Sequence, residues 1–350
     1  LMEGGVATSS SSAPAERIAD SEPTVPAVPA EGPTKYKIEK PKKADFRQRA
    51  HCNPLSDFVD KYPVSPDHVD WSVHYPEVFA AQARDGSSPA GAGAVGVLRL
   101  NTQECPIEYS AEPVDAALNG RNGPQVRFLD VGCGYGGLLV ALGPQFPDRL
   151  MLGMEIREQV TNYVGQRVRA LRSGADGAAS HNNVSVIRTN AMKFLPNYFR
   201  KAQLEKMFFC FPDPHFKRKN FRRRIISDGL LTIYAYVMAP GGMLYHATDV
   251  KELHEWMDRC CQEHPLFEAV PAEEQATDPC VAAVMNETEE AKRVRNLGRF
   301  GHDVHIGVFR RVLPAAGAGP GSSAAPVSTE EASDFTAPAP TPSGLNQEVG

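Results

Sequence analysis

Metal-binding cysteine pairs and long apolar runs are both missing from this 350-residue chain. Its seven cysteines include no C-x-x-C pair, and their odd number and irregular spacing indicate neither a zinc site nor a disulfide framework. Unpaired thiols of this kind are typical of cytosolic and nuclear proteins. No apolar run reaches the roughly 18 residues that a membrane-spanning helix needs, and the start lacks the basic and apolar regions of a signal peptide. We therefore expect no metal site and no membrane association.

Lys and Arg are also absent from residues 314–350, which carry four acidic side chains. Residues 1–34 carry five acidic side chains and one basic side chain. Both segments are rich in Ala, Pro, Gly and Ser and poor in aromatic residues, which predicts two disordered acidic tails. The formal net charge of −5 then becomes +3 for residues 35–313. The overall negative charge is therefore no argument against a nucleic-acid partner.

Between the tails, the composition divides the chain into three parts. Residues 35–79 form a basic N-terminal segment that ends in a mixture of aromatic residues and prolines, and we expect it to pack on or near the core. Residues 80–125 are interpreted as a linker or insertion, because residues 80–96 are rich in Ala, Gly and Ser. Residues 126–313 carry the pattern of a folded catalytic domain.

Short apolar runs alternate with helical patterns from residue 126 onward. The runs predict strands, and they cover residues 126–131, 151–156, 184–188, 207–211 and 242–248, with a late alternating strand at 303–312. Apolar residues at helical spacing predict helices around 160–171, 226–237 and 253–260. Strands that alternate with helices are typical of an α/β fold with a parallel sheet covered on both faces.

A glycine loop and an acid follow the first two predicted strands, where an α/β sheet binds its ligands. The loop DVGCGYGG, 130–137, contains G-x-G-x-x-G, which permits a tight turn and a close approach to a ligand. Glu155 follows 21 positions after Gly134 and can accept hydrogen bonds from both ribose hydroxyls of a nucleoside ligand. This combination suits a dinucleotide or S-adenosylmethionine. The acid Asp130 and the sequence FPDPHF, 211–216, favour S-adenosylmethionine.

A basic run follows directly, with six Lys or Arg residues between 215 and 224 and two interleaved phenylalanines, Phe216 and Phe221. Such a run can be a solvated surface or a docking site for a protein. Its place beside the candidate ligand site favours contacts with RNA phosphates, with the phenylalanines stacking on bases. The candidate phosphate contacts are Lys217, Arg218, Lys219, Arg222, Arg223 and Arg224.

Several motifs together resemble the eukaryotic tRNA (guanine-N7-)-methyltransferase family. They are DVGCGYGG, GMEIR (153–157), RTNAMKFLPNYF (188–199), MFFCFPDPHFKRKNFRRRIIS (207–227), HATDV (246–250) and NETEEAK (286–292), with RQRAHCNP (47–54) and DWSVHYPEVF (70–79) near the N-terminus. The resemblance implies a Rossmann-like, seven-stranded class I methyltransferase sheet with a late antiparallel strand. It also implies methyl transfer from S-adenosylmethionine to N7 of guanine at tRNA position 46, and a WD-repeat β-propeller as non-catalytic subunit.

The same resemblance assigns the site residues. The cofactor-binding residues it implies are Gly132, Gly134, Glu155, Ile156, Arg157, Asn190, Ala191, Cys210, Thr288 and Glu290. Asp213 matches the catalytic residue, and our hypothesis is that its carboxylate accepts hydrogen bonds from N1–H and N2–H of guanine. Lys40, Lys42 and Lys43 resemble a nuclear import signal, so we expect the protein in the nucleus, with the cytoplasm as a second location.

The sequence departs from the family pattern in places, and other functions stay open. Cys52 stands where a serine is expected, and the late motif reads TEEAK rather than TEEGK. One alternative is a nicotinamide oxidoreductase built on the same glycine loop. Another is an RNA-binding scaffold without catalysis, and a third keeps the N7-guanine chemistry but acts on mRNA or microRNA precursors.

Overall fold

The computed structural model describes residues 39–49, 52–56, 59, 61–84, 98–174, 180–297 and 303–314. The two acidic tails expected from the sequence lie outside these ranges apart from Pro314, as does most of the stretch 80–96. Within the described ranges, none of the helices combines the length and the apolar character that a membrane span requires.

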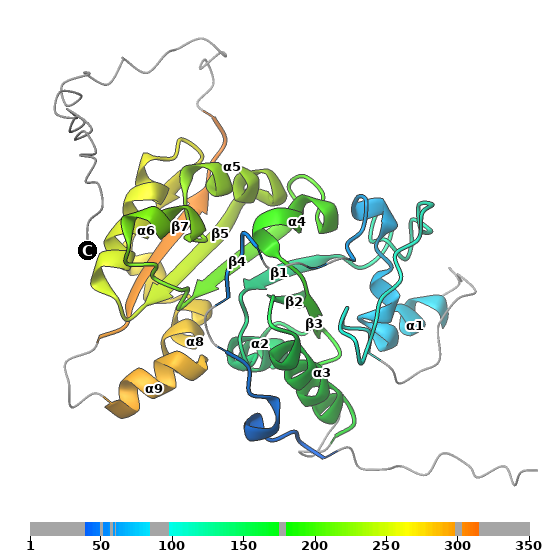
Figure 1. The fold of residues 1–350 in the computed structure, drawn as a ribbon. Coiled ribbons are helices and arrows are strands. Elements are labelled where there is room, and N and C mark those ends of the chain that lie inside the picture. Colours follow the sequence, from blue (N-terminus) through cyan, green and yellow to red (C-terminus); the bar gives the residue numbers. More distant parts are fainter. Residues whose placement is uncertain are drawn as a thin grey trace, which may run out of the picture. The chain divides into compact units, whose positions relative to one another are not determined.

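A seven-stranded mixed sheet organises the described residues, with the strand order β3-β2-β1-β4-β5-β7-β6 (Figure 1). The strands are β1 (Val126–Val131), β2 (Leu150–Glu155), β3 (Val184–Arg188), β4 (Leu204–Cys210), β5 (Met238–Thr248), β6 (Phe267–Ala269) and β7 (His305–Arg311). Strands β1 to β5 are parallel, whereas β7 pairs antiparallel with both β5 and β6. The α/β class and the late antiparallel strand are therefore confirmed.

Helices connect these strands and cover both faces of the sheet. The α-helices are α1 (Pro76–Arg84), α2 (Gly137–Leu142), α3 (Glu158–Arg172), α4 (Ala191–Tyr198), α5 (Asp228–Val237), α6 (Lys251–Glu263), α7 (Ala272–Gln275), α8 (Pro279–Glu287) and α9 (Glu289–Leu297). Short 3-10 helices are η1 (Lys43–Phe46), η2 (Pro66–His68), η3 (Trp71–Val73), η4 (Gly143–Gln145) and η5 (Arg218–Arg223).

Two strands differ from the sequence-based expectation. The fifth strand begins at Met238 rather than at residue 242, because an irregularity in its pairing with β4 between Leu204 and Lys206 accommodates the extra residues. Strand β6 was not predicted, since three residues are too few to produce an apolar period.

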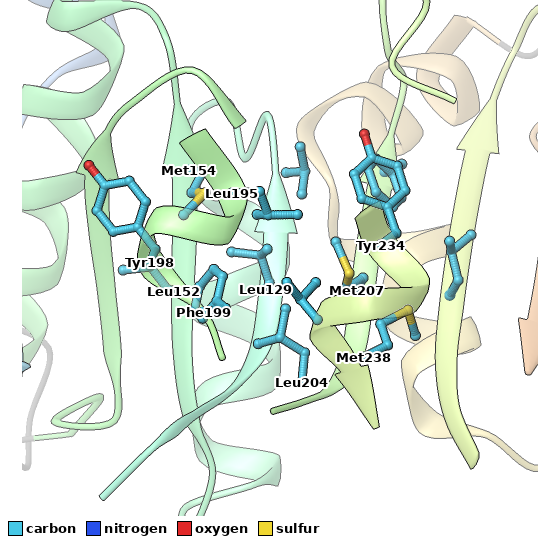
Figure 2. Packing of buried hydrophobic residues seen from close by; sticks show 14 of the residues in the cluster. Leu129, Leu152, Met154, Leu195, Tyr198, Phe199, Leu204, Met207, Tyr234 and Met238 are labelled. Carbon is cyan, nitrogen blue, oxygen red and sulfur yellow. The ribbon is translucent and has the colours of Figure 1, made fainter. Parts of the chain in front are cut away.

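Alternate side chains of the strands enter two separate hydrophobic layers, as the period of two in a strand requires. Figure 2 shows part of one layer, in which helix residues pack against strand residues: Leu195 and Tyr198 from α4, Tyr234 from α5, and Leu129, Leu152, Met154 and Met207 from the strands. The opposite layer includes Phe128, Met151 and Phe208 from the strands and buried residues of α2, α3 and α8. Figure 1 shows α4 and α5 on one side of the sheet and α2 and α3 on the other.

The N-terminal segment contributes directly to the first layer. Trp71 is 1% exposed and stacks on Phe199, with ring centroids 6.0 Å apart. Tyr75 is fully buried and donates a hydrogen bond from its hydroxyl to the Met151 carbonyl at 2.9 Å. The backbone N–H of Trp71 donates to the carbonyl of Leu118, which lies in the stretch 98–125. Residues that sequence composition separates from the catalytic domain are thus continuous with its core.

We expect Trp71→Ala to lower the free energy of unfolding by about 3–5 kcal/mol, because a large buried aromatic side chain is lost and a cavity remains. Val64 lies in the same segment but is 71% exposed, so Val64→Ala should change stability by less than about 0.5 kcal/mol. Urea denaturation followed by circular dichroism measures both. Equal, small effects would contradict the inclusion of this segment in the core.

Candidate active site

A cavity of about 270 Å³ opens at the carboxyl ends of strands β1, β2 and β4. The turns after these strands and the start of α4 supply most of its wall, as expected for an α/β sheet. Cys52 and Pro54 from the N-terminal segment complete the wall, together with Thr288 and the first two residues of α9, Glu289 and Glu290. The structure brings together at this cavity the predicted residues Gly132, Gly134, Glu155, Ile156, Arg157, Asn190, Ala191, Cys210, Asp213, Thr288 and Glu290, and also Arg223.

The glycine loop needs glycine for its backbone conformation. Gly132 and Gly134 have φ angles of +74° and +52°, a left-handed region that other residues enter at a cost. A β-carbon at Gly132 would meet no atom within 4 Å, so the requirement there is conformational and the space above the backbone is open. Gly136, with φ of +75°, precedes α2 as its N-cap. The loop therefore turns sharply and presents backbone to the cavity.

Glu155 holds the loop in place. Its Oε2 accepts a hydrogen bond from the Gly134 N–H at 3.1 Å, and its Oε1 accepts from the Ile156 and Arg157 N–H groups at 2.8 and 3.0 Å. The Arg157 guanidinium also donates to both oxygens, at 3.1 and 2.8 Å. Because these donors engage both oxygens, ribose hydroxyls would bind Glu155 by displacing the Arg157 side chain.

The cavity that Asp213 lines also contains four other carboxylates, from Asp130, Glu155, Glu289 and Glu290. Burial is the main reason why the pKa of Asp130 is raised well above its usual range, and the charges of Glu289, Glu155 and Glu290 add to the effect. The pKa of Glu290 is also raised, mainly by burial. Asp130 Oδ1 is buried with no hydrogen-bond partner among the described residues. A cavity with this crowding of negative charge favours a cationic ligand.

Sequence reasoning missed Glu289, which joins three parts of the site. Its carboxylate accepts hydrogen bonds from the Gly137 N–H at 3.1 Å, from Arg167 in α3 at 3.2 Å and from Lys43 in the N-terminal segment at 3.2 Å. A β-carbon at Gly137 would lie only 2.5 Å from Glu289 Oε2, so the last glycine of the loop is required by this contact. The position of Glu289 inside the TEEAK motif was the available indication.

Thr288 and Asn190 have structural roles beside the cavity. The Thr288 hydroxyl accepts a hydrogen bond from the Ala291 N–H at 3.1 Å and so stabilises the first turn of α9. The Asn190 side chain caps α4 by accepting from the Met192 N–H, and its amide donates to the Pro54 carbonyl at 2.6 Å. Asn190 therefore ties the N-terminal segment to the wall of the site.

Asp213 lies in a strained turn at the end of β4. Phe211 and His215, on either side of the Pro-Asp-Pro sequence, have φ angles of +53° and +47°. Left-handed conformations of such residues cost about 1–3 kcal/mol each and persist only where the surroundings impose them. Here the Phe211 N–H donates to the Ala247 carbonyl at 2.7 Å, and Arg224 donates to the Pro214 carbonyl at 3.0 Å. Both contacts hold Asp213 at the cavity wall.

The basic run divides into exposed and buried members. Lys217, Arg218, Lys219 and Arg222 are exposed, as is Phe216 at 63%. They are therefore placed to contact a large ligand beside the cavity. Arg223 is half-buried and lines the cavity itself.

The prediction that Arg224 contacts phosphates is wrong. Its side chain is 2% exposed and pairs with Glu252 at 3.2 Å, in addition to the hydrogen bond to Pro214. Its guanidinium lies 3.7 Å from the ring centroid of Phe221 and 4.8 Å from that of Trp256. Phe221 also packs edge-on against Trp256 and so is not available to stack on a base. These three side chains anchor the run on α6.

Comparisons with known proteins cover most of the chain. A family profile described as "Putative methyltransferase" matches residues 124–304. A tRNA (guanine-N(7)-)-methyltransferase of Oryza sativa subsp. indica is 50% identical over 272 residues, which cover 78% of this chain and 92% of the relative. The enzyme of the same name from Mus musculus is 48% identical, covering 78% and 91%. Among solved structures, the 16S rRNA methyltransferase KamB is 19% identical with a TM-score of 0.42, covering 62% of this chain and 99% of that chain.

The alignments with these two relatives cover nearly the whole length of each relative. Their sequence identities of 50% and 48% are high enough to establish family membership. The chain therefore belongs to the tRNA (guanine-N(7)-)-methyltransferase family.

Proposed function

We propose that this protein transfers a methyl group from S-adenosylmethionine to N7 of guanine in tRNA, at position 46 of the variable loop. The observation that carries the proposal is the cavity in which a glycine loop and four carboxylates lie beside Asp213. The chemistry of this cavity suits a cationic nucleoside donor, and the exposed cations beside it suit an RNA acceptor.

The residues of the cavity fit S-adenosylmethionine. When bound, this cofactor supplies an electrophilic methyl group on a positively charged sulfur. Asp130, Glu289 and Glu290 would complement the positive charges of the sulfonium and the amino group, which relieves their mutual repulsion in the cavity. Gly132 and Gly134 would allow the close approach of the ligand to the backbone, and Glu155 would accept the ribose hydroxyls. Ile156, Arg157, Asn190, Ala191, Cys210 and Thr288 would complete the binding surface.

Methylation of guanine N7 requires little acid–base chemistry from the protein. N7 carries a free lone pair at neutral pH, so no proton has to be removed before it attacks the methyl carbon. Catalysis then depends on an in-line arrangement with the reacting atoms about 3–3.5 Å apart. The Asp213 carboxylate would orient the base by accepting hydrogen bonds from N1–H and N2–H. Adenine has a different donor pattern on that edge and would be rejected.

The exposed part of the basic run would hold the RNA. Lys217, Arg218, Lys219 and Arg222 would contact phosphates, with the half-buried Arg223 at the cavity mouth. The guanine would be drawn out of its tertiary contacts to reach Asp213. The exposed ring of Phe216 provides a surface for stacking on a base.

We further propose a WD-repeat β-propeller as the non-catalytic partner. The resemblance to the eukaryotic enzymes supports this partner. Exposed apolar side chains of the N-terminal segment provide suitable chemistry for a protein contact: Leu55 is 40% exposed, Tyr62 43% and Val64 71%.

The deciding experiment measures transfer of tritium-labelled methyl groups to tRNAs that carry guanine or adenine at position 46, with and without a propeller subunit. We expect label only on the guanine tRNA. Asp213→Asn should lower kcat/KM for that tRNA by roughly 30- to 1000-fold, since loss of paired hydrogen bonds costs about 2–4 kcal/mol in the transition state. Absence of guanine-dependent label in both conditions would overturn the proposed function. Full activity of Asp213→Asn with unchanged guanine preference would overturn only the role of Asp213.

The raised pKa of Asp130 leads to opposite effects on stability and on cofactor binding. Burial raises the pKa above its unfolded value, so the cofactor-free protein loses stability as the pH rises from the unfolded-state pKa through the folded-state pKa. Asp130→Asn should therefore raise Tm without cofactor at pH 7, and this gain should shrink as the pH falls and disappear below the unfolded-state pKa of the carboxyl.

The same substitution should weaken cofactor binding by about ten- to a hundredfold, because one ionised partner of the cation is lost. Wild-type affinity should increase with pH up to pH 7, and the variant should keep only the weaker dependence due to Glu290. Calorimetric titration across this pH range measures both. The exposed Asp148 serves as the matched control, and Asp148→Asn should leave affinity and Tm unchanged. Identical pH profiles for Asp130→Asn and the wild type would contradict the electrostatic role.

The division of the basic run into exposed and buried members can be tested by measuring how tRNA binding depends on salt concentration. The double variant Arg218→Ala/Arg222→Ala should weaken tRNA binding and reduce the slope of log K against log salt by roughly 1–2. Arg224→Ala should instead lower the free energy of unfolding by about 1–3 kcal/mol, because its contacts lie inside the protein. The exposed Lys201 provides a control outside the run. A changed salt slope with unaltered stability in Arg224→Ala would contradict the structural role of this residue.

A further inference from the structure

A second cluster of titratable side chains lies under α6, outside the cavity described above. His246 is in β5, whereas His254 and Asp258 are four residues apart on α6 and so share one face of that helix. The antiparallel strand β7 runs beside β5, and its Gly307 is the register partner of His246. Figure 1 shows α6 beside β5 and β7.

The three side chains direct possible metal ligands to one point. His246 Nε2 lies 2.9 Å from Asp258 Oδ1, and His254 Nε2 lies 3.5 Å from Asp258 Oδ2. One ligand atom from each residue can be chosen so that all three lie within 4.8 Å of one another. Ligand bonds of about 2.0–2.1 Å in a tetrahedron place neighbouring ligand atoms roughly 3.3 Å apart. Small side-chain adjustments would therefore accommodate one ion.

Hydrogen bonds within the described part of the chain do not satisfy the buried polar atoms of His246 and Asp258. His246 is fully buried, and neither of its ring nitrogens has a hydrogen-bond partner among the described residues. Asp258 Oδ1 is buried and equally without a partner in that part of the chain, although it lies close to His246 Nε2. The two atoms are near each other but wrongly oriented for an N–H···O bond. Such buried groups are costly unless another partner, such as a cation, satisfies them.

Gly307 keeps the point of convergence open. A β-carbon at this position would lie 2.3 Å from His246 Nε2 and 2.4 Å from Asp258 Oδ1. The φ angle of Gly307 is not in the left-handed region that favours glycine, so the reason for glycine here is space and not backbone conformation. Any side chain on β7 at this position would fill the volume between the two ligand atoms.

Neighbouring rings fix the orientation of both imidazoles. Phe309 stacks on His246 with ring centroids 5.8 Å apart, and His305 stacks on His254 at 5.3 Å. Both neighbours come from the same face of β7 as Gly307. Ligands held in this way lose little rotational freedom when they bind an ion.

We propose that His246, His254 and Asp258 bind one divalent transition-metal ion, with Zn²⁺ as the best match and a water molecule in the fourth position. Two imidazoles with one carboxylate suit zinc, whereas Mg²⁺ and Ca²⁺ prefer sites made entirely of oxygen. The ion would join α6 to β5, and α6 carries Trp256, on which the basic run is anchored. Its role is therefore structural and independent of the proposed methyl transfer. A search for cysteine spacing misses this site because its ligands come from a strand and a distant helix.

The test uses the untagged full chain after chelator treatment. Equilibrium dialysis against Zn²⁺ with elemental analysis should find one ion per chain. A hundredfold excess of Zn²⁺ over Kd should raise Tm by about 5–10 °C. Co²⁺ in place of Zn²⁺ should give the visible absorption of a tetrahedral ion without the intense ultraviolet band of a thiolate complex. A thiolate band would assign the ion to cysteines and overturn the proposal.

Variants on α6 separate a metal site from a simple ion pair. Asp258→Asn and His254→Gln should each weaken Zn²⁺ binding at least tenfold and abolish the Tm increase. Glu255→Gln removes the same charge from the same helix at a side chain that is 63% exposed, and it should bind Zn²⁺ like the wild type. Circular dichroism verifies that each variant is folded. Because His254 is on the partly exposed side of the cluster, its variant keeps the test valid if Asp258→Asn does not fold. No Zn²⁺ binding by the wild type, or unchanged binding by the folded variants, would overturn the proposal.

Discussion

The concentration of negative charge at one edge of the sheet is the constraint on which the rest of the site depends. Asp130, Glu155, Glu289 and Glu290 share one cavity, and burial keeps water from screening Asp130 and Glu155. Much of the surrounding structure compensates these charges. Arg157 and backbone N–H groups engage Glu155, and Arg167, Lys43 and the Gly137 N–H engage Glu289. Asp130 Oδ1 has no such partner among the described residues, so the site retains an attraction for a cation.

The groups that neutralise these carboxylates come from distant parts of the chain. Lys43 reaches the site from the N-terminal segment, and Glu289 is the first residue of α9. Pro54 accepts a hydrogen bond from Asn190 at the start of α4. The cavity wall is therefore assembled from segments separated by more than 200 residues, as the Lys43–Glu289 separation of 246 positions illustrates.

The turn that carries Asp213 is also held by contacts with distant residues. These contacts offset backbone strain rather than negative charge. Two left-handed residues flank it, and hydrogen bonds from Arg224 and to Ala247 hold it. Arg224 can do this only because it is buried against Phe221, Trp256 and Glu252. One basic residue of the run thus supports the turn, and its exposed neighbours remain available for a polyanion. The proposed ion under α6 would stabilise the same helix from its other face.

Local sequence patterns determined the class of fold and the start of the ligand site. Apolar runs of four to eight residues and a G-x-G-x-x-G loop followed by an acid are short-range features, so they predicted strands 1 to 5, the glycine loop and Glu155 without knowledge of the fold. The resemblance to a known family supplied the role of Asp213 and the remaining site residues. The tertiary structure alone decided that Trp71 and Tyr75 belong to the core, that Glu289 joins three segments, that Arg224 is buried and that His246 meets Asp258. Whether a charged side chain faces solvent or an ion partner depends on which elements pack against it, and residue type and spacing along the chain do not contain that information.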